Sequence, residues 1–209
     1  MLARALAWQG VLSQVLGQIE LADRCLERAL ALVDDPALSD QGELRAFVLL
    51  SVVQRVVNTD LDRAKRLAEC SVVLYRALGD RWGMASSCVW LGWVIRDLGD
   101  YDKAREWLEE GLVLFRESGD RRGIAMSLSW LGLLAVVRGQ LEVGERLARE
   151  ATVTARDLDD HLLARIAVWA SCQASSARGS GSDSSLEGRT WSRKRLAGPL
   201  LAWVRGMRA

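Results

Sequence analysis

The 209-residue sequence contains two prolines and one histidine, and its four cysteines form no C-x-x-C pair. The shortage of proline favours helix throughout the chain. The single histidine, His161, and the scattered cysteines provide no set of ligands with the spacing of a zinc site. We therefore interpret the cysteines as small buried hydrophobic residues in a reducing compartment.

Long apolar runs are also missing. Stretches such as LGLLAVV, at residues 131–137, fall far short of the roughly 20 residues that span a membrane. At the N-terminus, Gln9, Ser13 and Gln14 interrupt the hydrophobic run that a signal peptide would need. We therefore expect a cytoplasmic protein that does not insert into a membrane.

The sequence has neither the G-x-x-x-x-G-K-[ST] loop that grips phosphates nor the G-x-S-x-G turn of hydrolases. The G-x-G of the segment GSGSDSSLEG, at residues 179–188, follows no predicted strand. The adjacent acids Glu109 and Glu110 diverge on a helix, so they are not placed to share a proton. We expect a protein that is not an enzyme and that has no metal site and no cofactor.

Acidic residues are absent after Glu187, where six basic residues follow. Residues 1–187 therefore hold 22 basic and 27 acidic residues, although the whole chain has a formal net charge of +1. A mildly acidic body argues against direct binding of nucleic acid by this part of the chain.

A short motif recurs along the chain at offsets of 42, 40 and 40 residues. It reads GQIELA at 17–22, TDLDRA at 59–64, GDYDKA at 99–104 and GQLEVG at 139–144. A fixed period of this length indicates a solenoid built from stacked repeats.

Each motif lies between two helical patterns. Apolar or small residues after Gly99 recur at helical spacing as far as Phe115. Gly99 can end the first helix in a left-handed cap and Asp100 can cap the second. The sequence G-D-R-x-G at 79–83 and 119–123 marks the next junction in the same way. The repeat unit is therefore predicted to be an antiparallel helical hairpin, helix A followed by helix B.

Tryptophans recur in the same register. Trp8, Trp90 and Trp130 each precede a motif glycine by nine residues, and a glycine follows each of them two positions later. A bulky ring beside a small position is typical of packed hairpins. We expect these three indoles to belong to the core.

These patterns resemble the tetratricopeptide repeat, which places Leu-Gly in helix A and small residues at two positions of helix B. The matching residues of the two clearest units are Leu91, Gly92, Ala104, Leu108 and Gly111, then Leu131, Gly132, Gly144, Ala148 and Ala151. The resemblance covers about residues 3–178 and implies an all-α, right-handed superhelical solenoid of about four and a half hairpins. The period of forty and the G-D-R-x-G junction are similar to repeats in the arms of bacterial signal-transducing ATPases and transcriptional activators.

We predict a repeat domain at residues 1–178 and a tail rich in Ser, Gly and Arg at residues 179–209. Met1 falls inside the first helix A without a polar cap, so we expect the domain to be truncated at its N-terminus. Three interpretations of the tail stay open: a flexible basic segment, the product of a shifted reading frame, or a basic amphipathic piece that binds an acidic partner or a membrane surface.

The resemblance implies that helices A line a concave groove, which here is apolar with an indole near its middle. The predicted partner-binding residues are Leu49, Val53, Val89, Trp93, Arg96, Met126, Ser129 and Leu133. Such a groove suits a partner helix or extended peptide that bears an acidic group. Another part of a longer chain would fill the same groove equally well.

The leading hypothesis is therefore a non-catalytic protein–protein interaction module of a bacterial regulatory protein. The alternative is a small-molecule-sensing arm of an ATP-dependent transcriptional activator, with an inducer in the groove. The exposed ends of the solenoid also allow self-association.

Overall fold

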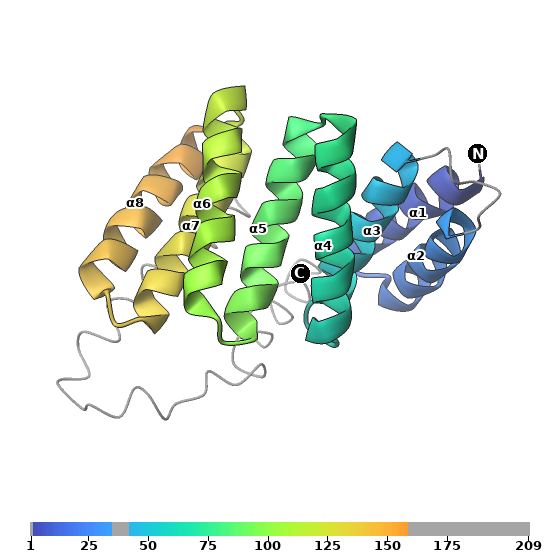
Figure 1. Ribbon diagram of the computed structural model, residues 1–209, viewed down its shortest axis with the longest axis horizontal. Helices are drawn as coiled ribbons and strands as arrows, with labels where there is room; N and C mark the ends of the chain where they lie inside the picture. The colour runs from blue at the N-terminus through green and yellow to red at the C-terminus, as the bar shows by residue number, and fades with distance from the viewer. Residues whose placement is uncertain (1, 35–41, 159–209) are drawn as a thin grey trace.

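The computed structural model describes residues 2–34 and 42–158, and within these ranges the chain forms eight consecutive helices (Figure 1). They are α1 (Leu2–Val15), α2 (Ile19–Val33), α3 (Gly42–Val56), α4 (Leu61–Leu78), α5 (Arg81–Asp97), α6 (Tyr101–Ser118), α7 (Arg121–Val137) and α8 (Leu141–Asp157). The all-α class and the tetratricopeptide-like solenoid predicted from the sequence are confirmed. The half hairpin predicted after the fourth hairpin and the predicted tail lie outside the described residues.

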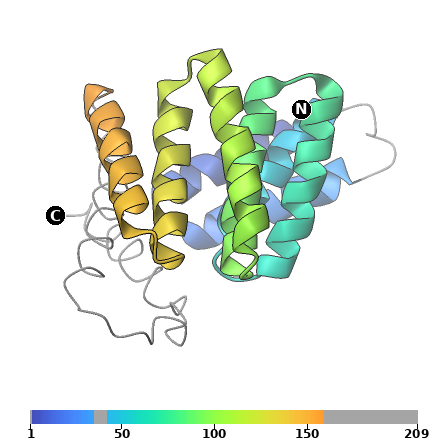
Figure 2. The same ribbon diagram turned by 60° about the vertical axis from the view of Figure 1, so that its left-hand side comes forward.

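Each helix packs mainly against its neighbours in the sequence. The hairpins are α1–α2, α3–α4, α5–α6 and α7–α8, and each hairpin packs onto the next through α2–α3, α4–α5 and α6–α7. The odd-numbered helices also contact one another in the order α1, α3, α5, α7. Figure 2 shows α6, α7 and α8 side by side as successive layers of this stack. The odd-numbered helices are therefore helices A, and the even-numbered ones are helices B.

The turns within the hairpins form as the sequence predicts. Gly99 has a φ of +93°, and its N–H donates to the carbonyl of Arg96 at 2.9 Å. A residue with a Cβ is disfavoured in this left-handed conformation, which explains the glycine. The Asp100 side chain then accepts a hydrogen bond from the backbone N–H of Lys103 at 3.2 Å, which caps α6.

The G-D-R-x-G junctions link one hairpin to the next. Asp80 accepts a hydrogen bond from the N–H of Gly83, and Asp120 accepts from the N–H groups of Arg122 and Gly123. The second glycine of each junction makes room for an aromatic ring. A Cβ on Gly83 would lie 2.3 Å from Tyr75, and a Cβ on Gly123 would lie 2.3 Å from Phe115. Both glycines are therefore required by packing between hairpins.

The Leu-Gly of the repeat has a matching role inside each hairpin. A Cβ on Gly92 would lie 2.7 Å from Leu108 Cγ and 3.0 Å from the carbonyl oxygen of Ala104. The glycine thus lets α5 and α6 approach closely. Leu108 is fully buried there and belongs to the main apolar core that runs through all four hairpins.

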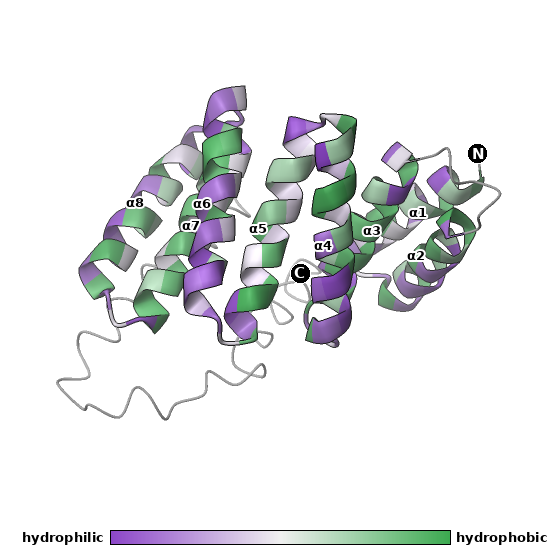
Figure 3. Ribbon diagram, in the orientation of Figure 1, coloured by the Kyte–Doolittle hydropathy of each residue, from purple (hydrophilic) through white to green (hydrophobic). Residues whose placement is uncertain are grey.

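Polar residues gather on the outward faces of helices B, as the hydropathy colouring of α4 and α6 shows (Figure 3). Ion pairs join consecutive helices B across these faces. Arg76 pairs with Glu110 at 3.1 Å, and Arg116 pairs with Glu150 at 3.6 Å, one repeat further on. All four side chains are at least one-third exposed, so each pair contributes little to stability.

Candidate functional site

The structure places the eight predicted groove residues on three helices A. Leu49 and Val53 lie on α3, Val89, Trp93 and Arg96 on α5, and Met126, Ser129 and Leu133 on α7. Seven of the eight are buried, and Met126 is partly buried. These three helices contact one another directly, and Trp93 and Arg96 of α5 lie beside Trp130 of α7 at one such contact.

Trp93 lies in the middle of a stack of three indoles. Its ring centroid is 4.9 Å from that of Trp90 and 4.2 Å from that of Trp130, with interplanar angles of 22° and 28°. Stacked aromatic pairs of this kind add to the free energy of burial. Trp93 therefore joins α5 to α7, and only 8% of the residue is exposed.

Arg96 lies beside this stack. Its guanidinium carbon is 5.2 Å from the ring centroid of Trp130 and 6.0 Å from that of Trp93, within the range of a cation–π interaction. The residue is 7% exposed, which is rare for an arginine. A buried cation of this kind requires a counter-charge.

Asp97 supplies that counter-charge. Its Oδ1 accepts hydrogen bonds from Nε and Nη2 of Arg96 at 2.9 and 2.7 Å. Its Oδ2 accepts from Nε1 of Trp93 at 3.1 Å. The carboxylate thus fixes both the arginine and the central indole, and the three indoles, Arg96 and Asp97 form one unit that we call the tryptophan–arginine cluster.

Three members of the cluster, Trp90, Trp130 and Asp97, were not predicted as site residues. Asp97 directly follows Arg96 and lies four residues after Trp93, a spacing that brings side chains together on a helix. Trp130 occupies the same repeat position as Trp90, so the sequence predicted its burial but not its contact with Trp93. The contact between helices A of different hairpins has no local signal in the sequence.

The prediction that Trp8 belongs to the core is wrong, because 53% of this residue is exposed. Its ring lies 5.0 Å from that of Phe47 on α3. Trp130, at the same repeat position, is 6% exposed because helices precede it in the stack. No described helix precedes α1 in this way.

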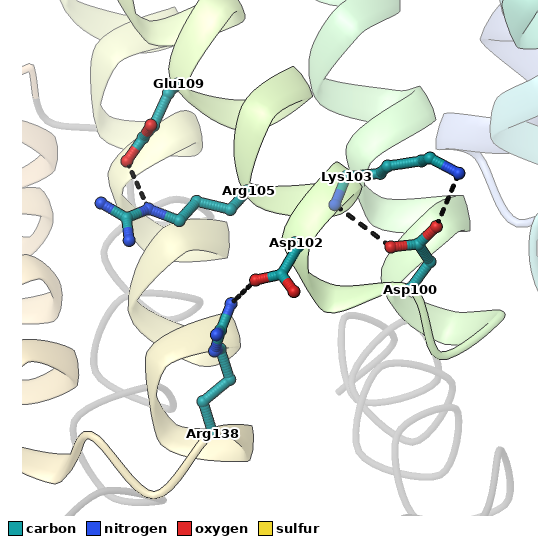
Figure 4. Close-up of polar contacts among 6 residues, drawn as sticks. All are labelled: Asp100, Asp102, Lys103, Arg105, Glu109 and Arg138. Atoms are coloured by element: carbon teal, nitrogen blue, oxygen red, sulfur yellow. Dashed lines mark hydrogen bonds and ion pairs between the residues drawn. The ribbon is translucent and has the colours of Figure 1, made fainter.

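Polar contacts outside the cluster lie both within α6 and between helices (Figure 4). Arg138, at the end of α7, pairs with Asp102 at 2.5 Å across a hairpin junction. Asp100 accepts hydrogen bonds from the side chain and the backbone of Lys103, and these lower the pKa of its carboxyl. The arginines of the G-D-R-x-G junctions are exposed, and each pairs with an acid near the end of its own helix B, Arg81 with Glu117 and Arg121 with Asp157.

The three cysteines among the described residues show no feature of a reactive site. Cys25 and Cys88 are buried, and burial raises the pKa of Cys88 to about 12. Cys70 is exposed, so its predicted burial is wrong; it lies on the outward face of α4. Cys172 and His161 lie outside the described residues.

Among residues 2–34 and 42–158, no group of three or more His, Cys, Asp or Glu side chains could hold a metal ion. None of the eight described helices combines the length and the apolar character that crossing a membrane requires.

The family model of the tetratricopeptide repeat matches residues 85–114, which lie within the α5–α6 hairpin. No curated protein matches the chain. The neighbouring α7–α8 hairpin has the same aspartate cap at the start of its helix A and the same close approach at its Leu-Gly glycine, and the described residues form four hairpins in series. Tetratricopeptide repeats are non-catalytic modules that generally mediate protein–protein interaction. The chain is a tetratricopeptide-like repeat protein.

Proposed function

We propose that this protein binds a helix or an extended peptide of a partner protein along the face formed by its helices A. The tryptophan–arginine cluster would hold the centre of that partner. The residues predicted from the sequence for this face are Leu49, Val53, Val89, Trp93, Arg96, Met126, Ser129 and Leu133, and those buried among them would support the face from beneath. Helices A are assigned this role because the predicted residues recur on α3, α5 and α7, which contact one another in series and so form one mainly apolar line.

One observation carries the proposal: Arg96 is a buried cation at the centre of this line. Asp97 uses one oxygen to accept from Nε and Nη2 of Arg96. A guanidinium has five N–H donors, so Arg96 has further donors for an acidic group. A carboxylate of the partner would accept hydrogen bonds from the Arg96 guanidinium, which the indoles hold in place.

Burial at the line determines how the partner would bind. Met126 is the predicted residue with the most accessible side chain, while Trp93 is 8% exposed and is covered on both faces by other indoles. We therefore assign direct apolar contact to Met126 and assign Trp93 to positioning Arg96. This division predicts that the partner carries an acidic residue next to an apolar one.

We further propose that the protein belongs to a bacterial regulatory protein and acts in the cytoplasm. The support is the resemblance of the forty-residue repeat and its G-D-R-x-G junction to the arms of bacterial signal-transducing ATPases and transcriptional activators. In such an arm, a partner that binds along helices A would shift the stacked hairpins, and this conformational change would reach an attached domain.

The test is a comparison of Arg96→Gln with Arg76→Gln in a pull-down from bacterial lysate. Arg76 is a matched control because it is also an ion-paired arginine, but it lies on the outward face of α4 and is about half exposed. Both variants must keep the helical circular dichroism of the wild type. Proteins lost with Arg96→Gln and kept with Arg76→Gln would support the proposal, and their affinity would then be measured with peptides. Identical sets from both variants would contradict it.

A small-molecule-sensing arm is the second candidate. Its support is the composition of the tryptophan–arginine cluster, since ligand sites combine aromatic side chains with a few placed polar groups. In this case one metabolite would raise the melting temperature of the wild type in a thermal-shift screen. The same metabolite would not change the melting temperature of the Arg96→Gln variant. No peptide would compete with the metabolite for binding.

A further inference from the structure

The tryptophan–arginine cluster holds two opposite charges that already balance each other. Arg96 carries the positive charge and Asp97 the negative charge, and Nη2 of Arg96 lies 2.7 Å from Oδ1 of Asp97. The three indoles add hydrogen-bond donors but no charge. The cluster is therefore neutral as a whole, although Arg96 keeps N–H donors that Asp97 does not use.

The unused donors lie at one end of the guanidinium. Nε and Nη2 of Arg96 donate to Asp97, and Nη1 donates no hydrogen bond to another described residue. Among residues 2–34 and 42–158, Arg55 Nε is the one fully buried side-chain nitrogen or oxygen without a hydrogen bond. Nη1 of Arg96 is therefore not fully buried. An acid can approach it from the end of the guanidinium while Asp97 keeps the other side.

The surroundings of Arg96 strengthen the effect of charge. Its guanidinium carbon lies 5.2 Å from the ring centroid of Trp130 and 6.0 Å from that of Trp93, and the residue is 7% exposed. Charges interact more strongly where most water is excluded, and salt screens them less there than at an open surface. A negative charge at Nη1 is thus attracted by Arg96 and repelled by Asp97.

The charge of the ligand decides which of these two effects prevails. A carboxylate adds one negative charge and accepts charge-assisted hydrogen bonds from the guanidinium. A phosphate monoester adds about 1.5 to 2 negative charges at pH 7, so it leaves a larger negative excess beside Asp97. Uncompensated charge in a mostly dry site is costly. The neutral cluster therefore favours a carboxylate over a phosphate.

We propose that Asp97 is the specificity-determining residue of the Arg96 site and makes this site select singly charged carboxylates against phosphate groups. The inference rests on the proposed function, in which Arg96 binds the acid of a partner protein. Asp97 acts through its charge and through its hold on Arg96, without touching the ligand. The partner would accordingly bind through an Asp or Glu side chain, and a phosphorylated residue in its place would be rejected.

The test uses two probes of similar shape, phenylacetate and phenyl phosphate, which differ in the charge of the acidic group. Each probe is titrated into the full protein at constant ionic strength, and NMR follows the side-chain N–H signals of Arg96 and Trp93. The variants Arg96→Gln and Trp93→Phe assign these signals. The wild type should bind phenylacetate with a Kd of about millimolar size, and at least about tenfold more tightly than phenyl phosphate.

Asp97→Asn removes the negative charge but keeps an oxygen that accepts hydrogen bonds. This variant should reverse the preference, so that phenyl phosphate binds at least as tightly as phenylacetate. Glu110→Gln is the matched control, because Glu110 is the acid paired with the exposed Arg76 at 3.1 Å. It should leave the preference of the Arg96 site unchanged. Circular dichroism checks that both variants fold, and the preference of the wild type tests the inference without either of them.

Two results would overturn this inference and leave the proposed function standing. The first is equal or tighter binding of phenyl phosphate by the wild type. The second is an unchanged preference in folded Asp97→Asn. A different result, no saturable shift of the Arg96 and Trp93 signals with either probe up to about 50 mM, would overturn the inference together with the proposed role of Arg96.

Discussion

Phe115 lies directly over Gly123, and a Cβ on that glycine would approach Phe115 Cδ1 to 2.3 Å. Tyr75 stands over Gly83 in the same way, one repeat earlier. The contact joins the end of one helix B to the start of the next helix A. The distance between successive hairpins is therefore set by an aromatic ring that packs directly against the backbone of a glycine.

Gly123→Ala should reduce the free energy of unfolding by about 1–3 kcal/mol, the usual cost of overpacking a well-filled core. The measurement is urea unfolding followed by circular dichroism. Gly42→Ala is the control, since a Cβ there would meet Leu78 at an ordinary 3.6 Å, and its effect should stay within about 0.5 kcal/mol. Recovery of stability in the double variant Phe115→Leu with Gly123→Ala would assign the loss to the ring. Equal effects of the two glycine substitutions would refute the account.

Asp120→Ala should destabilise the protein by about 1 kcal/mol through loss of a helix cap. Asp120 accepts hydrogen bonds from two backbone N–H groups at the start of α7. Gln140→Ala is the matched control, because Gln140 stands at the same place before α8 and makes no side-chain cap hydrogen bond. The difference between the two variants in urea unfolding measures the cap alone, and no difference would show that the cap contributes nothing.

The hairpins could be predicted from the sequence because their signals are local. Gly99 and Asp100 specify a turn within two residues, and the apolar spacing on either side specifies two helices. The fixed period then extends the result from one hairpin to the next. Nothing in this step requires knowledge of contacts between distant residues.

The tryptophan–arginine cluster could be predicted only in part. The sequence identified Trp93 and Arg96 as neighbours on one helix, but it gave no angle between successive helices A. That angle decides whether Trp130 reaches Trp93 or faces solvent. The predicted burial of Trp8 is wrong for a related reason. Burial at this repeat position depends on a neighbouring helix, and the repeat position alone does not show that such a helix is present.

The carboxyl of Asp100 should titrate below the ordinary range of aspartate. The hydrogen bond from the Lys103 side chain is the largest cause, followed by the bond from the Lys103 backbone. A lowered folded-state pKa stabilises the protein above the unfolded-state pKa, and this contribution is lost as the pH falls through the folded-state value. Lys103→Met should raise the pKa of Asp100 in an NMR titration. Lys65→Met should raise it less, because Lys65 acts only through its charge. A larger rise in the pKa of Asp100 with Lys65→Met than with Lys103→Met would contradict this order of the two effects.

Removing Asp97 should cost more stability than removing Arg96. Asp97→Ala leaves the Arg96 cation without its counter-charge in a position that is 7% exposed. Breaking a buried ion pair in this way costs roughly 3–5 kcal/mol. Arg96→Met leaves an Asp97 side chain that is 18% exposed and still accepts from Nε1 of Trp93, so its cost should be smaller.

The double variant Arg96→Met with Asp97→Asn distinguishes an electrostatic loss from a packing loss. Replacing a buried ion pair with uncharged side chains of similar volume is often neutral. The double variant should therefore be more stable than Asp97→Ala, as measured by urea unfolding with tryptophan fluorescence as the probe. If it is instead the least stable of the three, the charge pair itself stabilises the seam between α5 and α7. In that event a partner's acid would have to bind Arg96 through the N–H donors that Asp97 does not use, with the Arg96–Asp97 pair kept intact.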